Sequence, residues 1–461
     1  MNYEEAVAYL LDIPKFAGKT THENLRGFLR LLGNPHEQIP AIHIAGTNGK
    51  GSTCAFLSSI LQQAGYQVGV FTSPHLVKIN ERFRLNDSMI SNEEFLIIFE
   101  KVRDAVETGL QAGLVYPNFF EFVFLMAVCW YEVQKPDYVI YETGLGGRLD
   151  ATNVLQPYLT ILTSIGMDHM QYLGNTLEQI AGEKTGILKA NTPCIYLCQK
   201  DVTETVIQRR GEELGILMLP VEKDKITIDE IQEQTIDFSY VNRYDSKYSC
   251  RKQPVTYRMK KTALYQAENA AIAIEAGYYL LSNPIKKGDK LKNIVRSISE
   301  ADGEENTEEF VHKAICRGIY QMNWQGRMEE IEPGIYVDGA HNEPAIRAFC
   351  DTVTRIYLDK KIILLFAVAS DKRYNEMIRI LCETVSYEKI IITAIDGVRT
   401  TPVEQVQELF QQYTDCPIVT APDISQAWDL AHDCLRSDNR VFCVGSLYLV
   451  GSLEAKKEEE P

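Results

Sequence analysis

The fold of the first half of this chain is decided by the stretch Ile42-His43-Ile44-Ala45-Gly46-Thr47-Asn48-Gly49-Lys50-Gly51-Ser52. Its first four residues predict a short strand, and the residues from Gly46 onward predict a tight glycine-rich turn. Apolar side chains then recur at helical spacing within residues 53–64, at Leu57, Ile60, Leu61 and Ala64. A strand, a glycine-rich turn and an amphipathic helix in this order are typical of a nucleotide-binding βα unit.

The turn has the chemistry of a phosphate site. Glycines let backbone N–H groups approach a phosphate, while the helix N-terminus and Lys50 supply positive charge. Ser52 or Thr53 can offer a hydroxyl group to the phosphate or to its metal ion. The spacing departs from the common G-x-x-x-x-G-K-[ST] pattern, because Gly51 separates Lys50 from Ser52. We nevertheless predict that this loop binds a nucleotide.

Strand and helix patterns alternate through the rest of the chain, which predicts an α/β fold with mainly parallel sheets covered by helices on both faces. We expect further strands at 68–71, 138–141, 159–162, 335–337, 362–368, 390–394 and 441–444, and a helix at 424–435. The chain is expected to divide into a P-loop-type N-terminal domain over 1–321, a smaller Rossmann-like C-terminal domain over 322–455, and a charged, frayed tail over 456–461. Between 284 and 321, a lysine-rich stretch and an acidic stretch at 300–309 predict a surface insertion.

Composition excludes several classes of function. The 461 residues carry 47 basic and 63 acidic side chains, a net charge of −16, which disfavours binding to nucleic acid. The longest strongly apolar run, 122–131, is too short to span a bilayer, and Glu4 and Glu5 stand where a signal peptide would be basic. The 11 cysteines are scattered, and they predict reduced thiols in a cytoplasmic protein.

Three polar residues follow predicted strands and point to a metal site beside the loop. Glu142 ends the strand 138–141, His169 follows 159–162, and Ser73 follows 68–71. The carboxyl ends of parallel strands meet at one edge of a sheet, and a bound triphosphate needs a divalent cation there. Each residue alone is more typical of a turn or a cap than of a ligand, but together they predict a Mg²⁺ site.

A series of short phrases in a fixed order resembles the folylpolyglutamate synthase family, including its bacterial bifunctional dihydrofolate synthase form, within the Mur ligase superfamily. The N-terminal phrases are 46–52, Thr72-Ser73-Pro74-His75-Leu76, Asn80-Glu81-Arg82, Phe119-Phe120-Glu121, 142–153, Ile165-Gly166-Met167-Asp168-His169 and Glu183-Lys184-Thr185-Gly186-Ile187. The C-terminal phrases are Trp324-Gln325-Gly326-Arg327, Asp338-Gly339-Ala340-His341-Asn342 and 445–451. Each phrase is only moderately specific, and the resemblance rests on their number and order.

The resemblance implies an ATP-dependent amide ligase. ATP would phosphorylate a folate carboxylate, the amine of L-glutamate would attack the acyl phosphate, and phosphate would leave. The acceptor would be a folate and also dihydropteroate, in a cytoplasmic monomer that needs Mg²⁺; a need for a monovalent cation such as K⁺ stays open. A cleft that closes between two domains would keep water from the reactive intermediate.

The resemblance also implies roles for individual residues. Lys50, Lys184 and His341 would be catalytic. ATP would be bound by Thr47, Asn48, Gly49, Lys50, Gly51, Ser52, Asn269, Arg327, Asp338 and His341. Mg²⁺ would be held by Ser73, Glu142, His169 and a carbamylated Lys184. The folate or pteroate would contact Asn118, Phe119, Leu149, Asp150 and Ala151, and glutamate would contact Arg82 and Ser446.

Four positions depart from the family pattern. Tyr265 stands where a histidine usually precedes Gln266, Gln325 replaces a proline, Arg373 replaces an acid, and Phe124 replaces a threonine beside the expected folate pocket. None of these changes removes an expected phosphate or metal ligand.

Two other functions stay open. Another Mur-type amide ligase is possible, although only about 45 residues precede the loop and leave no room for a UDP-binding domain. A non-enzymatic nucleotide switch is the second alternative, although the chain has no Asn-Lys-x-Asp guanine motif.

Overall fold

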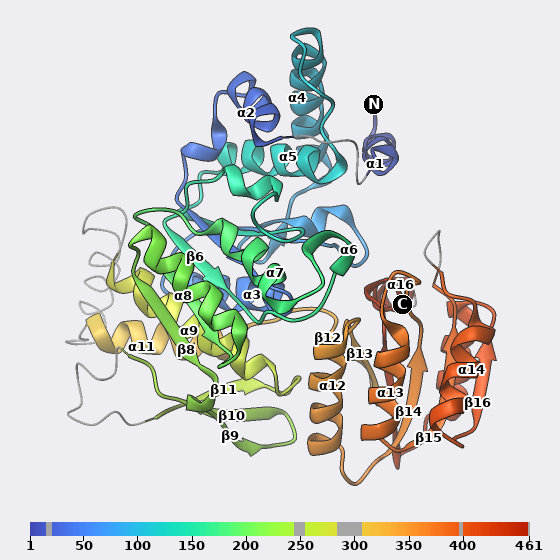
Figure 1. The fold of residues 1–461 in the computed structure, drawn as a ribbon. Coiled ribbons are helices and arrows are strands. Elements are labelled where there is room, and N and C mark those ends of the chain that lie inside the picture. Colours follow the sequence, from blue (N-terminus) through green and yellow to red (C-terminus); the bar gives the residue numbers. More distant parts are fainter. Residues whose placement is uncertain (15–20, 244–253, 284–306, 396–399, 460–461) are drawn as a thin grey trace.

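The computed structural model describes residues 1–14, 21–243, 254–283, 307–395 and 400–459. It contains an eight-stranded sheet, a three-stranded sheet and a six-stranded sheet. We refer to the described residues up to 321 as the N-terminal domain and to 327–459 as the C-terminal domain. The predicted boundary at 321 falls between α11 (Thr307–Gln321) and β12 (Arg327–Glu332), and it stays a prediction. Figure 1 shows the two domains side by side.

The eight-stranded sheet has the order β4-β3-β2-β5-β1-β6-β7-β8, and its strands from β2 to β8 in this order run parallel. The central strands are β1 (Ala41–Ala45), β2 (Val68–Phe71), β5 (Tyr138–Glu142), β6 (Leu159–Leu162), β7 (Cys194–Cys198) and β8 (Met218–Glu222). The short strands β3 (Phe83–Leu85) and β4 (Ser88–Met89) add an antiparallel edge. The mainly parallel α/β sheet predicted from the sequence is therefore confirmed.

Helices bury both faces of this sheet. One face packs against α3 (Lys50–Gln63), α9 (Gln266–Ser282) and α11, in a core that includes Ile42, Ile44 and Ile140. The other face packs against α1 (Tyr3–Asp12), α2 (His22–Leu31), α4 (Asn92–Gln111) and α5 (Phe119–Gln134), in a core that includes Val139 and Tyr141. Successive strand residues alternate between the two cores, as a sheet covered on both sides requires.

The rest of the N-terminal domain extends the sheet beyond β6. Helices α6 (Met170–Leu173), α7 (Leu177–Lys184) and α8 (Val202–Leu214) pack around a smaller core with Ala45 and Leu162. A separate antiparallel sheet of β9 (Ile226–Ile231), β10 (Thr235–Tyr240) and β11 (Val255–Lys260) lies beside α9 and α11 (Figure 1). The short 3₁₀ turns are Pro35–Glu37, Ile79–Arg82, Ala151–Val154, Thr185–Ile187 and Lys223–Lys225.

The C-terminal domain has a six-stranded sheet of order β12-β13-β17-β14-β15-β16, parallel except for β12. Its other strands are β13 (Ile335–Asp338), β14 (Lys361–Phe366), β15 (Tyr387–Thr393), β16 (Ile418–Ala421) and β17 (Asn439–Val444). Its helices are α12 (Glu343–Ile356), α13 (Tyr374–Thr384), α14 (Val403–Tyr413), α15 (Ile424–Cys434) and α16 (Leu447–Glu459). The expected smaller α/β domain is thus confirmed.

The structure corrects several details. The helix that follows the glycine-rich loop, α3, begins at Lys50 rather than Thr53, because Gly49 in its left-handed conformation forms the N-cap. Residues 456–459 continue α16 rather than fraying. The sheet β9–β11 was not predicted, although β11 alternates apolar residues at Val255, Tyr257 and Met259 with polar ones, as a half-exposed antiparallel strand does. Most of the predicted insertion, including 300–306, lies outside the described residues.

Two further findings concern the membrane and thiol predictions. In the part of the chain that the structure describes, no helix is both long and apolar enough to cross a bilayer. The apolar run 122–131 lies inside α5 and is buried against the sheet. Ten cysteines fall in the described ranges, and no disulfide joins any of them.

Candidate active site

A cavity of about 1,250 Å³ lies between the two domains. All 21 residues to which the sequence gave binding or catalytic roles line it, although they come from positions 47 to 446. They belong to the loop after β1 and the start of α3, to the segments after β2, β5, β6 and β13, to the end of α7, to the start of β12, and to the starts of α5, α9 and α16. The structure therefore brings the predicted residues together, while their individual roles stay predictions.

The glycine-rich loop has the geometry of an anion site. Gly49 has φ +85°, and the first intrahelical hydrogen bond of α3 runs from Thr53 N to the Gly49 carbonyl over 2.8 Å. The N–H groups of residues 50–52 therefore precede the hydrogen-bonded part of the helix and are available to a phosphate. A Cβ atom on Gly49 would lie 2.2 Å from Asn269 Oδ1, so the close approach of α9 requires glycine here.

Neighbouring strands hold the loop in place. Thr47 N donates to the Ser164 carbonyl over 2.7 Å, and the Thr47 hydroxyl donates to the Gly166 carbonyl over 3.0 Å. The Thr163 hydroxyl donates to the Asn48 carbonyl over 2.8 Å. The loop after β1 is thus fixed to the loop after β6, which carries His169.

Lys50 faces a buried carboxylate. Its Nζ lies 3.9 Å from Glu142 Oε1 and donates to the Thr47 carbonyl over 3.2 Å. The other Glu142 oxygen accepts from Ser73 N over 2.9 Å. Burial raises the pKa of Glu142, and the positive charge of Lys50 opposes that rise. Glu142 and Ser73, two of the three residues predicted at strand ends, thus meet beside the loop lysine, and their role as metal ligands stays a prediction.

Lys184 is buried beside the same loop. Its Nζ donates to the Gly46 carbonyl over 2.7 Å, and the residue is only 3% exposed. Burial, reinforced by the charge of Lys50, lowers the pKa of Lys184 to about 7. A large share of this amine is therefore neutral at neutral pH, which is the form that reacts with carbon dioxide to give a carbamate.

His169 begins α6 in a left-handed conformation, with φ +49°. Its Nε2 lies 3.8 Å from Asp168 Oδ2. Burial lowers the pKa of His169 to about 4, so the ring is neutral at pH 7 and keeps a lone pair for a metal. Within the described ranges, no group of three or more His, Cys, Asp or Glu side chains forms a metal site by itself. The expected set differs from such a group, because it combines Glu142 and His169 with the hydroxyl of Ser73 and with Lys184.

The C-terminal domain presents Arg327, Asp338 and His341 to the cavity. Asp338 Oδ2 accepts from the Tyr265 hydroxyl of the N-terminal domain over 2.7 Å and from Met328 N over 3.0 Å. His341 Nδ1 is 2.7 Å from the Gly339 carbonyl. Burial, together with the nearby charge of Lys372, lowers the pKa of His341 to about 4. A neutral His341 can accept or pass on a proton at the cleft.

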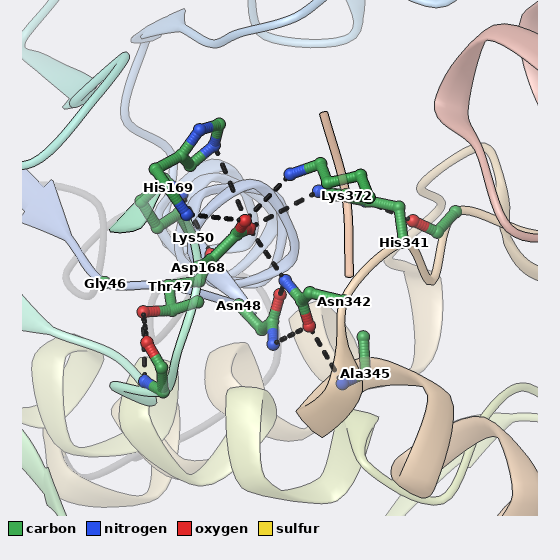
Figure 2. A network of polar contacts seen from close by, with 12 residues as sticks. Gly46, Thr47, Asn48, Lys50, Asp168, His169, His341, Asn342, Ala345 and Lys372 are labelled. Carbon is green, nitrogen blue, oxygen red and sulfur yellow. Dashed lines mark hydrogen bonds and ion pairs between the residues drawn. The ribbon is translucent and has the colours of Figure 1, made fainter. Parts of the chain in front are cut away.

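A polar cluster links the domains at the floor of the cavity (Figure 2). Asp168 accepts from Lys372 Nζ over 2.8 Å and from Asn342 Nδ2 over 2.9 Å. Asn342 also exchanges two side-chain hydrogen bonds of 3.0 Å with Asn48. Sequence reasoning gave no role to Asp168, Asn342 or Lys372. A signal existed, because Asp168 follows β6 and Lys372 follows β14 at the carboxyl edges of their sheets.

At the expected folate end, several polar side chains already have structural partners. Asn118 caps α5 by exchanging hydrogen bonds with Glu121, and Asp150 caps the 3₁₀ turn at 151–154. Asp150 also accepts from Leu145 N over 2.8 Å, so it shapes the loop between β5 and β6. Leu149 is 78% exposed at the cavity, and it therefore offers an apolar contact to a ligand.

Phe124, which the sequence placed beside the folate pocket, does not reach the cavity in the structure. Phe124 is fully buried between Phe71 and Tyr141, with ring centroids 6.2 and 5.9 Å away, and it does not line the cavity. Phe120, one turn nearer the start of α5, lines the cavity instead. A change from threonine to phenylalanine at 124 therefore alters the core under the site rather than its wall.

Arg82 and Ser446 lie where the two domains meet. Arg82 is buried, its Nε donates to His75 Nδ1 over 2.8 Å, and its guanidinium lies 5.3 Å from the Phe119 ring centroid. Burial lowers the pKa of Arg82 to about 10, which leaves the group positively charged at neutral pH. The Ser446 hydroxyl accepts from Tyr448 N over 3.1 Å at the start of α16. A buried cation facing a helix start is suited to binding a carboxylate.

Comparisons with known proteins agree with this geometry. The Mur ligase middle domain matches residues 44–277, and the Mur ligase glutamate ligase domain matches residues 326–447. The chain is 34% identical over 392 residues to the dihydrofolate synthase/folylpolyglutamate synthase of Bacillus subtilis, covering 84% of each chain.

Solved structures share the whole fold. A folylpolyglutamate synthase from Thermotoga maritima is 27% identical, covers 100% of this chain and 97% of its own, and superposes with a TM-score of 0.77. E. coli FolC in complex with DHPP and ADP is 24% identical, with 100% and 98% coverage and a TM-score of 0.78. The second likeness supports the fold alone.

Proposed function

Because this chain belongs to the folylpolyglutamate and dihydrofolate synthase family of Mur ligases, we propose that the cavity between its domains is the active site. The chain is an ATP-dependent ligase that adds glutamate to folates. We propose that it accepts both folates and dihydropteroate. The observation that carries this proposal is the meeting of the Lys50 loop with Arg327 and His341 of the other domain in one cavity. Neither domain alone contains both halves.

The nucleotide would lie with its phosphates on the loop 47–52. Lys50 and the N-terminus of α3 provide positive charge for the β- and γ-phosphates. Arg327 approaches from β12, where its guanidinium lies against the backbone of Gly339. A cation from the opposite domain can stabilise the charge of the transferring phosphoryl group only when the domains are closed.

The chemistry proceeds in two steps. A carboxylate oxygen of the folate attacks the γ-phosphorus, so ADP leaves and an acyl phosphate forms. The glutamate amine then attacks the acyl carbon, loses a proton, and phosphate leaves. His341 is neutral and lines the cavity, so we propose that it receives the amine proton. Arg82 and the start of α16 at Ser446 would hold the glutamate carboxylates.

The donor set at the loop suits a hard divalent cation. Glu142 presents a buried carboxylate, Ser73 a hydroxyl group, and His169 a neutral ring. We propose that these residues hold Mg²⁺, joined by Lys184 as a carbamate, which would turn a buried amine into an anionic ligand. The metal would neutralise phosphate charge. Carbon-13 NMR of enzyme equilibrated with labelled carbon dioxide would detect the carbamate, and Lys184→Met should remove that signal.

Dihydropteroate is proposed as a second acceptor because of the relatives. The Bacillus subtilis protein carries both activities in its name, and E. coli FolC was solved with DHPP and ADP bound. The cavity runs from the nucleotide loop to Phe119 and Leu149, so aromatic and apolar surface is available for the pterin end of either acceptor. We also propose a monomer, because both halves of the cavity come from one chain, and a cytoplasmic location.

The decisive experiment measures ATP-dependent incorporation of labelled glutamate into dihydropteroate and, separately, into a reduced monoglutamyl folate. We expect product with both acceptors and one ADP for each glutamate. Lys50→Met should lower turnover by about a hundredfold or more, since it removes the phosphate-facing charge. Lys200→Met is the matched control, because Lys200 forms an exposed ion pair with Asp224 outside the cavity.

Other results would identify the alternatives. Product with the folate alone would restrict the enzyme to polyglutamylation. If the enzyme ligates glutamate to neither acceptor but another carboxylic acid stimulates ATP turnover, the chain is a different Mur-type ligase. Slow ATP hydrolysis that no acceptor or glutamate stimulates would favour a nucleotide switch.

A further inference from the structure

We infer that Asp168 is a positioning residue that couples closure of the two domains to the phosphate loop, through its contacts with Lys372 and Asn342 (Figure 2). The inference rests on the proposed function, because it concerns how the active site excludes water. It adds a role for three residues that are neither expected phosphate ligands nor expected metal ligands.

The contacts of Asp168 cross the domain boundary. Its carboxylate belongs to the N-terminal domain, where it accepts from His169 N over 2.8 Å, and its two other donors, at 2.8 and 2.9 Å, belong to the C-terminal domain. His341 of that domain also places Nε2 3.7 Å from Asp168 Oδ2. One carboxylate thus gathers a cation, an amide and an imidazole from the opposite domain.

The ion pair is largely hidden from solvent, with side-chain exposure of 9% for Asp168 and 12% for Lys372. Burial acts against ionisation, yet the nearby positive charges hold the pKa of Asp168 well below its usual value. Removing one partner of a buried charge pair leaves the other charge without compensation. Opening the domains would instead separate the two charges and return them to water, so the 2.8 Å contact is made only in the closed arrangement.

The same cluster connects closure to the nucleotide. Asn342 caps α12 by accepting from Ala345 N over 3.0 Å, and it pairs with Asn48 in the phosphate loop. Asp168 is two residues from Gly166, which exchanges hydrogen bonds with Thr47. A displacement of the C-terminal domain would therefore disturb the loop at both Asn48 and Thr47.

Other contacts also join the domains, which is why Asp168 is assigned to positioning rather than to folding. Leu264 N donates to the Thr352 hydroxyl over 3.1 Å, and the Thr262 hydroxyl donates to the Arg327 carbonyl over 2.9 Å. These contacts would keep the domains attached after Asp168 is changed. The cleft at the phosphate end would then close less completely, and water would reach the acyl phosphate.

The test compares Asp168→Asn, Lys372→Met and the double variant with the wild-type full-length enzyme. Three quantities are measured: kcat and the ADP released per glutamate incorporated at saturating substrates, and KM for ATP from an ATP titration. For Asp168→Asn we expect kcat to fall about tenfold or more with little change in KM, because closure rather than nucleotide contact is weakened. The ratio of ADP to product should rise about threefold or more, as water competes with the amine.

The double variant tests whether Asp168 acts through its partner. In the Lys372→Met background, Asp168→Asn should lower kcat by a much smaller factor than it does in the wild-type enzyme, since the partners share one interaction. The exposed ion pair between Lys361 and Asp438 of the C-terminal domain is the matched control, and Asp438→Asn should leave all three quantities unchanged.

The outcomes separate this inference from the proposed function. If the wild-type enzyme incorporates no glutamate, the proposed function fails. If the wild-type enzyme is active but Asp168→Asn still releases one ADP per product, the inference is overturned. It is also overturned if Asp168→Asn lowers kcat by the same factor in the wild-type enzyme and in the Lys372→Met variant. Thermal unfolding of each variant verifies folding, and a variant that does not fold is replaced by Asn342→Ala, for which the same rise in the ADP ratio is expected.

Discussion

Asn48 in the phosphate loop and Asn342 at the start of α12 exchange two side-chain amide hydrogen bonds of 3.0 Å, although 294 residues separate them in the sequence. Each amide both donates to and accepts from the other, so the pair is satisfied only when the two domains face each other. The loop proposed to receive the phosphates is thereby in direct contact with the domain that carries Arg327 and His341. This relationship makes the cavity a joint product of both domains.

Gly49→Ala should disable the loop. Its φ of +85° disfavours any L side chain, and the added Cβ would meet Asn269 Oδ1 at 2.2 Å. We expect a loss of stability of about 2 kcal/mol or more, together with a loss of ATP turnover. Chemical denaturation and the glutamate incorporation assay measure the two effects.

The matched control is Gly33→Ala. Gly33 has φ +86°, but nothing lies within 4 Å of the Cβ that alanine would add. It should therefore cost about 1 kcal/mol from backbone strain alone and leave turnover unchanged. Equal effects of the two substitutions would contradict a special role for the space beside Gly49.

Lys184 should make stability depend on pH. The pKa of the buried amine is lowered from 10.5 to about 7, so between these values the unfolded chain binds a proton that the folded protein does not. Stability contributed by this group therefore rises as the pH increases from 7 toward 10.5. Denaturation at pH 7 and 9.5 should show the wild-type protein gaining a few kcal/mol, on the order of one per pH unit, relative to Lys184→Met. If the free energy of unfolding changes with pH in the same way in both proteins, residue 184 is not a buried neutral amine.

His169→Ala should weaken the metal site rather than the fold. The ring is neutral at pH 7, since its pKa is lowered to about 4, and its side chain is 39% exposed toward the cavity. We expect the Mg²⁺ concentration for half-maximal activity to rise about tenfold or more. His432→Ala, which removes an exposed ring 3.4 Å from Glu332, is the control. Wild-type rates for His169→Ala across a Mg²⁺ titration would remove His169 from the ligand set.

Tyr265→Phe should affect nucleotide binding. The Tyr265 hydroxyl donates to Asp338 across the domain boundary, and its loss leaves a buried carboxylate oxygen with one donor fewer. KM for ATP should rise about three- to tenfold, with a smaller change in kcat. Tyr265→His restores the residue typical of the family and should recover much of the loss. If Tyr265→Phe leaves KM unchanged, the hydroxyl does not help to place Asp338.

The sequence by itself determined the strand, turn and helix of the glycine-rich loop, the parallel arrangement of the main sheets, and 21 of the residues that line the cavity. These features follow from local patterns, because alternation of strands with helices fixes the sheet type and the carboxyl ends of parallel strands meet at one edge. Glu142 and His169 could therefore be predicted to converge, although they are 27 residues apart.

Only the tertiary structure decided how the domains meet. No local pattern shows that Asp168 faces Lys372, that Asn48 pairs with Asn342, or that Phe124 points into the core rather than into the pocket. Burial likewise decided the neutral character of Lys184 and His169, since a pKa depends on the solvent and charges that surround a side chain. Such contacts depend on the relative placement of two separately packed cores, which short-range sequence periodicity does not encode.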